Sequence, residues 1–244
     1  MKIQRLIMAA LMGGAMMIPV WAAPTDANPA GNSNLMITAD QLTYDGVSGR
    51  AEVKGSVVIT KDDKTMTGAI GWYNTNTQEG YLTGGVSMIG TNMSMAASEV
   101  HVLHNQQFDA TGNVHLQKDD RQLYGDHVNY NTETGYGEII GNGQLMVADN
   151  ILTGEHITAF TNEISATAKG NVTVSSTSRN INATADEAVY TQTPNQNDGV
   201  AYLKGNARAV QNGNVLEAPE LKIQLSDNSA ETLGGRSTLI ITPK

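Results

Sequence analysis

The stretch AEVKGSVVI, at residues 51–59, alternates apolar and polar side chains around a central Gly-Ser pair. Successive side chains of an extended chain point to opposite faces, so this pattern predicts a strand with one buried and one solvated face. The apolar set is Ala51, Val53, Val57 and Ile59, with Val58 as an exception on the polar side. No comparable helical period occurs beyond residue 34, so the sequence predicts an all-β fold.

The glycine of this stretch recurs along the chain in the same setting, followed each time by a small or polar residue. The seven pairs are Gly55-Ser56, Gly84-Gly85, Gly112-Asn113, Gly141-Asn142, Gly170-Asn171, Gly205-Asn206 and Gly234-Gly235, at intervals of 29, 28, 29, 29, 35 and 29 residues. A single unit of this size cannot bury its own apolar face, so the repeat predicts an architecture of stacked units.

A second strand precedes the glycine of most units. It opens on a small residue and often an acid, as in Ala39-Asp40, Gly125-Asp126, Gly154-Glu155 and Ala185-Asp186. It often ends on tyrosine, at Tyr44, Tyr73, Tyr130 and Tyr190, where Asn, Asp and Gly residues signal a turn. Seven units of two strands predict about fourteen strands in one repeat-built domain over residues 35–242. A β-solenoid is the alternative architecture.

The apolar side of the repeat contains few aromatic residues, because the chain has only two Phe and two Trp. If each unit gives one strand to each of two sheets, splayed sheets would leave an apolar trough, and a filled sandwich is the alternative. The scarcity of Phe and Trp favours the trough, which would suit acyl chains. We therefore expect an inner face of small and aliphatic residues. The residues predicted to line the groove are Val53, Val57, Ile59, Leu82, Val86, Met88, Val114, Leu116, Ile139, Leu145, Val172, Val174 and Leu203.

The N-terminus has the pattern of an export signal over residues 1–23, followed by a flexible linker over residues 24–34. Lys2 and Arg5 precede an apolar core that ends in a small-residue context for cleavage. Retention of this segment as a membrane anchor is the alternative. Cleavage leaves 13 basic and 24 acidic residues, a net charge of about −11, which argues against nucleic acid as a partner. With no Cys in the chain, neither a lipoprotein anchor nor a disulfide is possible.

The titratable residues do not form a recognisable catalytic or metal-binding motif. Asp126-His127 and Glu155-His156 look like dyads, but both occupy the same slot of the repeat, so we expect surface residues. The remaining histidines are His101, His104 and His115. Catalysis would need a nucleophile and an orienting group that converge in one pocket. The sequence therefore predicts a protein that is not an enzyme and that uses no cofactor or metal.

The repeated strands resemble those of the OstA/LptA family of periplasmic lipopolysaccharide-transport proteins, which are related to the periplasmic domains of LptC and LptD. The resemblance spans nearly the whole chain beyond the predicted signal. The matching stretches are ITADQLTY (37–44), AEVKGSV (51–57), ATGNV (110–114) and AKGNV (168–172). It implies a twisted, partly open β-jellyroll of antiparallel strands whose apolar interior holds the acyl chains of lipopolysaccharide through its lipid A part.

The resemblance also implies a periplasmic location and end-to-end assembly with itself, or with similar β-jellyroll domains of inner- and outer-membrane transport proteins. Two alternatives stay open: a structural β-solenoid and a membrane-anchored component like LptC or the LptD N-terminal domain. A β-solenoid enzyme acting on polysaccharide is the least favoured reading.

The two ends of the repeat predict exposed sheet edges. An open stack of strands leaves unpaired N–H and C=O groups at both edges, which are ready to pair with another chain. The residues expected to take part in such assembly are Leu35, Ile37, Leu239 and Ile241. Because the two edges differ in sequence, pairing of the first with the last would propagate rather than close as a dimer.

Overall fold

The computed structural model describes residues 35–242, except for residues 62, 92, 104–106, 119–120, 132, 148–149, 161–164, 179, 192, 194–198 and 225–228. The predicted export signal at residues 1–23 and the linker at residues 24–34 lie outside the described residues, as do His104 and most of the lengthened turn at residues 193–199.

The described residues form β-strands joined by turns. The strands are β1 (Met36–Thr38), β2 (Gln41–Asp45), β3 (Arg50–Lys61), β4 (Lys64–Asn74), β5 (Glu79–Ile89), β6 (Met93–Leu103), β7 (Gln107–Lys118), β8 (Arg121–Asn131), β9 (Tyr136–Val147), β10 (Asn150–Phe160), β11 (Ser165–Ser176), β12 (Ile181–Thr191), β13 (Val200–Gln211), β14 (Asn214–Gln224), β15 (Ser229–Leu233) and β16 (Thr238–Ile240). In this part of the chain no helix has the length and apolar character needed to span a bilayer.

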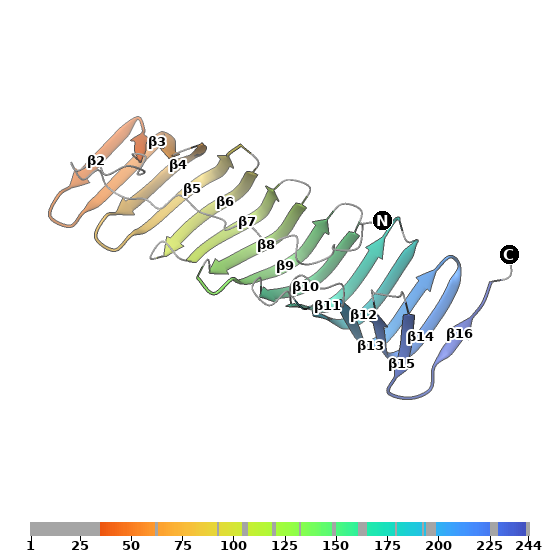
Figure 1. Cartoon of the computed structure of the whole chain (residues 1–244). Helices are drawn as coiled ribbons and strands as arrows, with labels where there is room; N and C mark the ends of the chain where they lie inside the picture. The colour runs from red at the N-terminus through yellow and green to blue at the C-terminus, as the bar shows by residue number, and fades with distance from the viewer. Residues whose placement is uncertain are drawn as a thin grey trace. The chain divides into compact units, whose positions relative to one another are not determined.

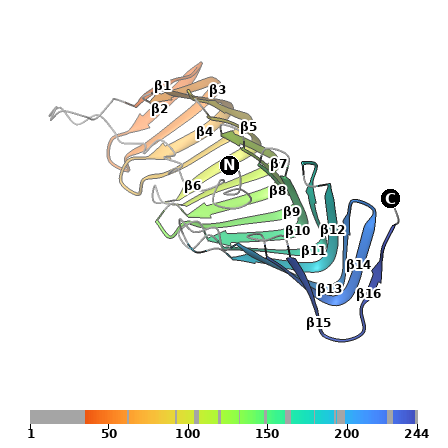
Figure 2. The same cartoon turned by 45° about the vertical axis from the view of Figure 1, so that its right-hand side comes forward.

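The chain folds into two compact units. The first, here called the N-terminal unit, contains β1 to β7 and Asp126–Glu133 of β8 and its turn. The second, the C-terminal unit, contains Asp120–Gly125 at the start of β8 and the chain from Thr134 onward. Within each unit, neighbours in the sequence are neighbours in the sheet, as Figures 1 and 2 show for β3 to β7 and for β9 to β14.

Every strand pair described is antiparallel, which confirms the predicted all-β class and excludes a solenoid of parallel coils for these residues. The expectation that each unit gives one strand to each of two sheets is wrong. The β3 strand pairs with β4 along its length, and β4 pairs in turn with β5. Each long strand therefore contributes to both halves of a bent sheet.

The outermost positions of the strand order are each divided into two short strands. At one end, β2 pairs with the first half of β3 and β1 with its second half. At the other end, β16 pairs with the first half of β14 and β15 with its second half. If each divided edge is counted as one position, the sixteen strands described occupy the fourteen positions that the repeat predicts.

The repeated glycine produces a bend in the middle of each odd-numbered long strand. Gly112 and Asn113 both have a positive φ, of 82° and 49°, and the same pair of conformations recurs in Gly170 and Asn171. The register shifts at these positions, for example between Lys169 and Val172 in the β11–β12 pair. Two left-handed residues in succession form a bulge, which bends the strand. The repeat thus encodes the bend as well as the strands.

An acid from the neighbouring position of the sheet binds to several of these bends. Ser56 Oγ donates to Asp40 Oδ2 at 3.1 Å, and Asn206 Nδ2 donates to Asp186 Oδ2 at 3.0 Å. A Cβ built on Gly205 would lie 2.3 Å from that same Asp186 oxygen, so the bend needs glycine for space as well as for φ. Asp40 and Asp186 belong to the small-residue–acid pairs that the sequence predicts to open a strand. That prediction is wrong, because Asp186 lies in the middle of β12 and Asp40 between β1 and β2; these acids bind the bulge instead.

The apolar sides of the strands form the core of each unit. Contrary to the expectation of an inner face without bulky side chains, Phe108 and Tyr130 are buried there, with their ring centroids 5.8 Å apart. Tyr73 and Tyr190 are buried on the same side of their strands, and burial raises the pKa of Tyr73 to about 12. The tyrosines that end the strands therefore fill the interior, whereas Tyr44 at the edge is exposed.

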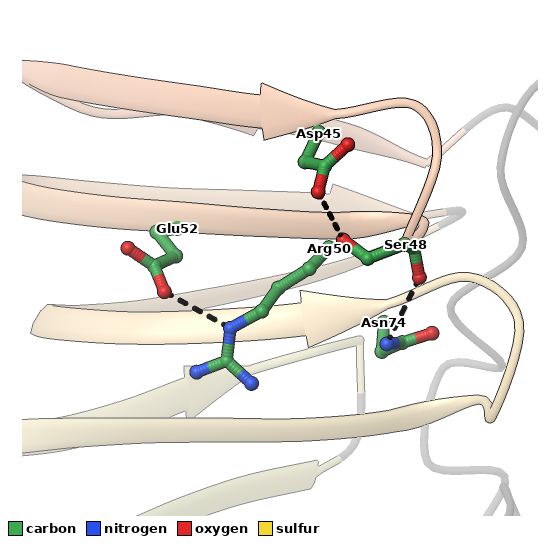
Figure 3. Close-up of polar contacts among 5 residues, drawn as sticks. All are labelled: Asp45, Ser48, Arg50, Glu52 and Asn74. Carbon is green, nitrogen blue, oxygen red and sulfur yellow. Dashed lines mark hydrogen bonds and ion pairs between the residues drawn. The ribbon is translucent and has the colours of Figure 1, made fainter.

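Neighbouring turns are joined along the sheet by side chains. In Figure 3, Ser48 donates to the Asp45 carboxylate at 2.7 Å, and Asn74 Nδ2 in the next turn donates to the Ser48 carbonyl at 3.3 Å. The backbone N–H of Thr75 also donates to the Gly49 carbonyl at 2.8 Å. Asx and Ser residues at these turns thus connect one hairpin to the next as well as closing their own.

Candidate functional site

Twelve of the thirteen residues predicted to line a groove are buried. They lie on the odd-numbered long strands β3 to β13 and are Val53, Val57, Ile59, Leu82, Val86, Met88, Val114, Leu116, Ile139, Leu145, Val172 and Leu203. Val174 is only partly buried. The alternation read from the sequence therefore places the inner face correctly on these strands.

The even-numbered strands supply the other half of the inner face, which the sequence analysis did not assign. These residues include Met66, Met95, Val100, Leu123, Leu152, Ile157 and Leu221. Their signal was present in the sequence, because buried and partly exposed residues alternate in β6 as they do in β5. The repeated glycine marks only the odd-numbered strands, although the even-numbered strands follow the same period of two.

The inner face is closed to water by the side chains of the chain itself. Val57, Val114 and Val172 are each no more than 2% exposed, and the aromatic ring of Phe108 lies among such residues. The described interior is therefore a packed core and not the empty trough that the scarcity of Phe and Trp favoured. The reason is that tyrosine, which the count of Phe and Trp omits, supplies much of the missing bulk.

The predicted edge residues lie at the two ends of the strand order. Ile37 is in β1 opposite Ile59, and Leu35 directly precedes that strand. Leu239 is in β16 opposite Leu216, and Ile241 directly follows that strand. Leu239 and Ile241 are 61% and 69% exposed, so the second edge carries apolar side chains into solvent.

The histidines of the predicted dyads do not pair with the acids beside them. His127 Nε2 lies 2.7 Å from Asp109 Oδ2 on β7, and His156 Nε2 lies 2.6 Å from Glu138 Oε1 on β9. The adjacent acid Glu155 accepts instead from Asn171 at the bend of β11. Each histidine is 29 residues from its counterpart, and so is each acid. These are cross-strand pairs of the repeat on the outer face.

No group of three or more His, Asp or Glu residues placed to hold a metal ion occurs among the described residues. Asp63, in the turn between β3 and β4, takes part in a contact between turns. Its carboxylate accepts a hydrogen bond from the Thr91 N–H at 3.2 Å, and bonds from the Thr91 hydroxyl and N–H lower the pKa of Asp63 to about 2. This contact joins the β3–β4 turn to the β5–β6 turn.

One family model matches the part of the chain that carries the repeat. The family described as LptA/(LptD N-terminal domain) LPS transport protein matches residues 72–165 and 110–229, which together span more than half of the chain. No curated protein matches. A similar solved structure is that of LptH from Pseudomonas aeruginosa, described as the LptA homologous periplasmic component of the conserved lipopolysaccharide transport device. Its identity is 12% and its TM-score 0.19, over 86% of this chain and 95% of that chain.

The two family matches overlap and begin at Trp72, in β4, and run to β15. They cover bends of β5 to β13, with the buried apolar sides that flank them. The chain therefore belongs to the LptA/(LptD N-terminal domain) family of LPS transport proteins.

Proposed function

We propose that this chain is a periplasmic protein that holds the acyl chains of lipopolysaccharide against its inner face and passes the lipid on by joining end to end with similar domains. The observation that carries the proposal is the apolar inner face that continues from strand to strand within each unit. Its family supplies the class of ligand.

The chemistry of the inner face suits acyl chains. Val, Leu, Ile, Met and Ala side chains make up most of it, beside Phe108 and the rings of Tyr73, Tyr130 and Tyr190, and apart from the tyrosine hydroxyls Ser176 is the only buried polar side chain among the residues described. An acyl chain gains about 0.8 kcal/mol for each CH₂ group removed from water. A chain of a dozen carbons therefore gains about 10 kcal/mol, which can offset the separation of the two halves of a few bent strands.

The proposed transfer needs the two halves of the sheet to separate locally. Small residues favour this separation because they interlock less deeply than branched ones. Ala110, Ala168 and Ala207 lie next to the bends of their strands and are fully buried. We propose that acyl chains enter at these positions, where the bend lies close by and little side-chain volume must be displaced.

Light-induced crosslinking tests the inner-face proposal. A photoreactive amino acid at Leu116, which is buried, is expected to crosslink to lipopolysaccharide in cells. The same amino acid at Asn113, which is exposed at the bend of the same strand, is expected not to. Equal crosslinking from both positions would overturn the proposal, since a lipid adsorbed on the outside would reach Asn113 at least as well.

A further inference from the structure

The outer face of the N-terminal unit has an open cleft of about 450 Å³ over β2, β3, β4 and β5. Ile70, Trp72 and Tyr81 form apolar parts of its lining, and Arg50 and Lys54 contribute positive charge. Small-molecule sites occupy about 300–1,000 Å³ and combine apolar walls with a few polar groups. The cleft has this composition, although it lies on the face that the alternation of the sequence assigns to solvent.

The aromatic wall of the cleft is held in place by its neighbours. Trp72 and Tyr81 are directly opposite each other on β4 and β5, and His101 on β6 is opposite Tyr81. The His101 ring meets Trp72 and Tyr81 edge to face, at centroid distances of 6.0 and 6.1 Å. Tyr81 also donates its hydroxyl hydrogen to Glu99, which raises the pKa of Tyr81. The wall is therefore ordered before any ligand binds.

Arg50 is oriented by two contacts. Its guanidinium carbon lies 4.3 Å from the centre of the Trp72 ring. Its Nε donates to Glu52 Oε1 at 3.0 Å, and Figure 3 shows this second contact. Neither terminal nitrogen of this guanidinium has a hydrogen-bond partner among the residues described, and the side chain is 40% exposed. A guanidinium held in this way presents two parallel donors to an oxyanion.

Lys54 provides a second positive charge on the same face. It lies four residues after Arg50 on β3, a separation of about 13 Å at the usual rise of a strand. Lys54 is exposed and, within the described chain, has no ion-pair partner. Opposite it on β4 is Ile70, which is also exposed. The two cations thus stand at separate points of a cleft whose floor is apolar.

We propose that this cleft binds a phosphorylated saccharide. The C–H faces of sugar rings pack on aromatic and aliphatic side chains, and their hydroxyls bond to polar groups such as Thr43 and Glu52, which line the cleft. Phosphate groups at separate points of the saccharide would meet Arg50 and Lys54. The net charge of the chain, −9, disfavours a long polyanion. A compact one meets Arg50 and Lys54 together with one lining carboxylate, Glu52, which is already paired with Arg50. The identification of this saccharide as the sugar part of a lipopolysaccharide rests on the proposed function. The argument that the cleft binds a phosphorylated saccharide rests on the chemistry of its lining alone.

Tryptophan fluorescence gives a direct readout of this site. The chain has two tryptophans, so in the full chain carrying Trp21→Phe only Trp72 reports. The probe is lipopolysaccharide stripped of its acyl chains, which cannot use the inner face. We expect a saturable change in fluorescence, at least tenfold weaker binding after the phosphates are removed from the saccharide, and much weaker binding of inorganic phosphate. No saturable change, or equal binding without phosphates, overturns the proposal.

Substitutions distinguish binding in this cleft from a general effect of the charge of the protein. Arg50→Gln and Lys54→Gln are each expected to weaken binding about tenfold or more, because each removes a charged donor. Glu52→Gln is expected to tighten it, since Glu52 competes for Arg50. Lys204→Gln is the matched control: Lys204 precedes Gly205 on β13 as Lys54 precedes Gly55 on β3, and it is equally exposed. An equal loss in Lys54→Gln and Lys204→Gln overturns the proposal.

Lys54→Gln also distinguishes this inference from the proposed function, because Lys54 is not among the buried residues of the inner face. If the cleft is a separate site, the Lys54→Gln variant no longer binds the deacylated saccharide, whereas the photoreactive amino acid at position 116 still crosslinks to intact lipopolysaccharide. Crosslinking that fails in the unsubstituted protein while the saccharide binds would reject the inner-face proposal alone. A melting temperature within a degree or two of the unsubstituted protein, measured for each variant, assigns these losses to binding.

Discussion

Gly84 and Gly85 show at single residues why the repeat needs glycine. Both have a positive φ, of 88° and 79°, so both are in a conformation that other residues adopt at a cost. Only Gly84 also lacks space, because a Cβ built on it would lie 2.4 Å from the Cβ of Ala69, whereas one on Gly85 would meet nothing within 4 Å. The backbone requirement and the packing requirement can therefore be measured separately.

We expect Gly85→Ala to destabilise the protein by about 1–2 kcal/mol, the cost of a left-handed alanine. Gly84→Ala pays the same cost and a further 1–3 kcal/mol, roughly, for the displaced neighbour. Urea unfolding followed by circular dichroism measures both. Equal midpoints for the two variants would show that the close approach to Ala69 contributes nothing.

The lowered pKa of Asp63 predicts that the free energy of unfolding depends on pH in the acid range. Its pKa is lowered to about 2 by hydrogen bonds from Thr91, so the carboxylate stabilises the folded state above its ordinary pKa of 3.8. This contribution falls as the pH drops from about 4 through 2. Because Asp63 is fully exposed, the effect is small. An NMR titration of the Asp63 carboxyl should give a midpoint near 2 that moves toward 3.8 in Thr91→Ala; an ordinary midpoint in the unsubstituted protein contradicts the prediction.

At the scale of the elements, the acid in the middle of an even-numbered strand and the residue after the repeated glycine act together. Asp186 on β12 accepts from Asn206 on β13, and Glu155 on β10 accepts from Asn171 on β11. Each contact joins two neighbouring strands at the bend, where the ladder of backbone hydrogen bonds is interrupted. We infer that this side-chain hydrogen bond compensates for the stability lost where the bulge interrupts the backbone ladder.

A double-mutant cycle on Asp186→Ala and Asn206→Gly is expected to give a coupling of about 0.5–1.5 kcal/mol. Glycine removes the Asn206 amide and still accepts the φ of 50° found there. The same cycle between Asp186 and Asn171, which are not bonded to each other, is the control and should give a coupling near zero. A coupling near zero in both cycles would mean that the hydrogen bond between Asp186 and Asn206 does not stabilise the bend.

The strands and their buried faces could be predicted from the sequence because both depend on local alternation, as in residues 51–59. The bend and the pairing could not. The sequence places Gly170 and Asn171 inside a continuous strand, but only the three-dimensional register shows that they bend it. The cleft around Trp72 was missed for a related reason: its residues come from four strands, and each is unremarkable within its own.

At the scale of the whole molecule, the two edges of the strand order are chemically different. The first is formed by β1 and β2 and the last by β15 and β16, and no first-to-last pair joins them among the described residues. Apolar side chains are exposed at both, including Met36 and Leu42 at the first and Leu239 to Ile241 at the last. Pairing between unlike edges would be head to tail and would continue from copy to copy.

We expect the double variant Ile37→Cys and Ile240→Cys to form ladders of disulfide-linked copies on oxidation. The chain contains no cysteine of its own, so every crosslink reports the two introduced positions. Each single variant should stop at a dimer at most, which is the matched control. A double variant that yields no ladder on non-reducing gels at high protein concentration would contradict end-to-end assembly.

The simple strand order has a consequence for how such proteins change in length. The long strands between β3 and β14 pair only with their neighbours in the sequence, so the addition there of a two-strand unit of about 29 residues leaves every other pairing intact. Each duplication would lengthen a unit by about 10 Å, at 4.8 Å per strand. Reach is therefore a trait that gene duplication can adjust in equal steps, without a new solution for the interior each time.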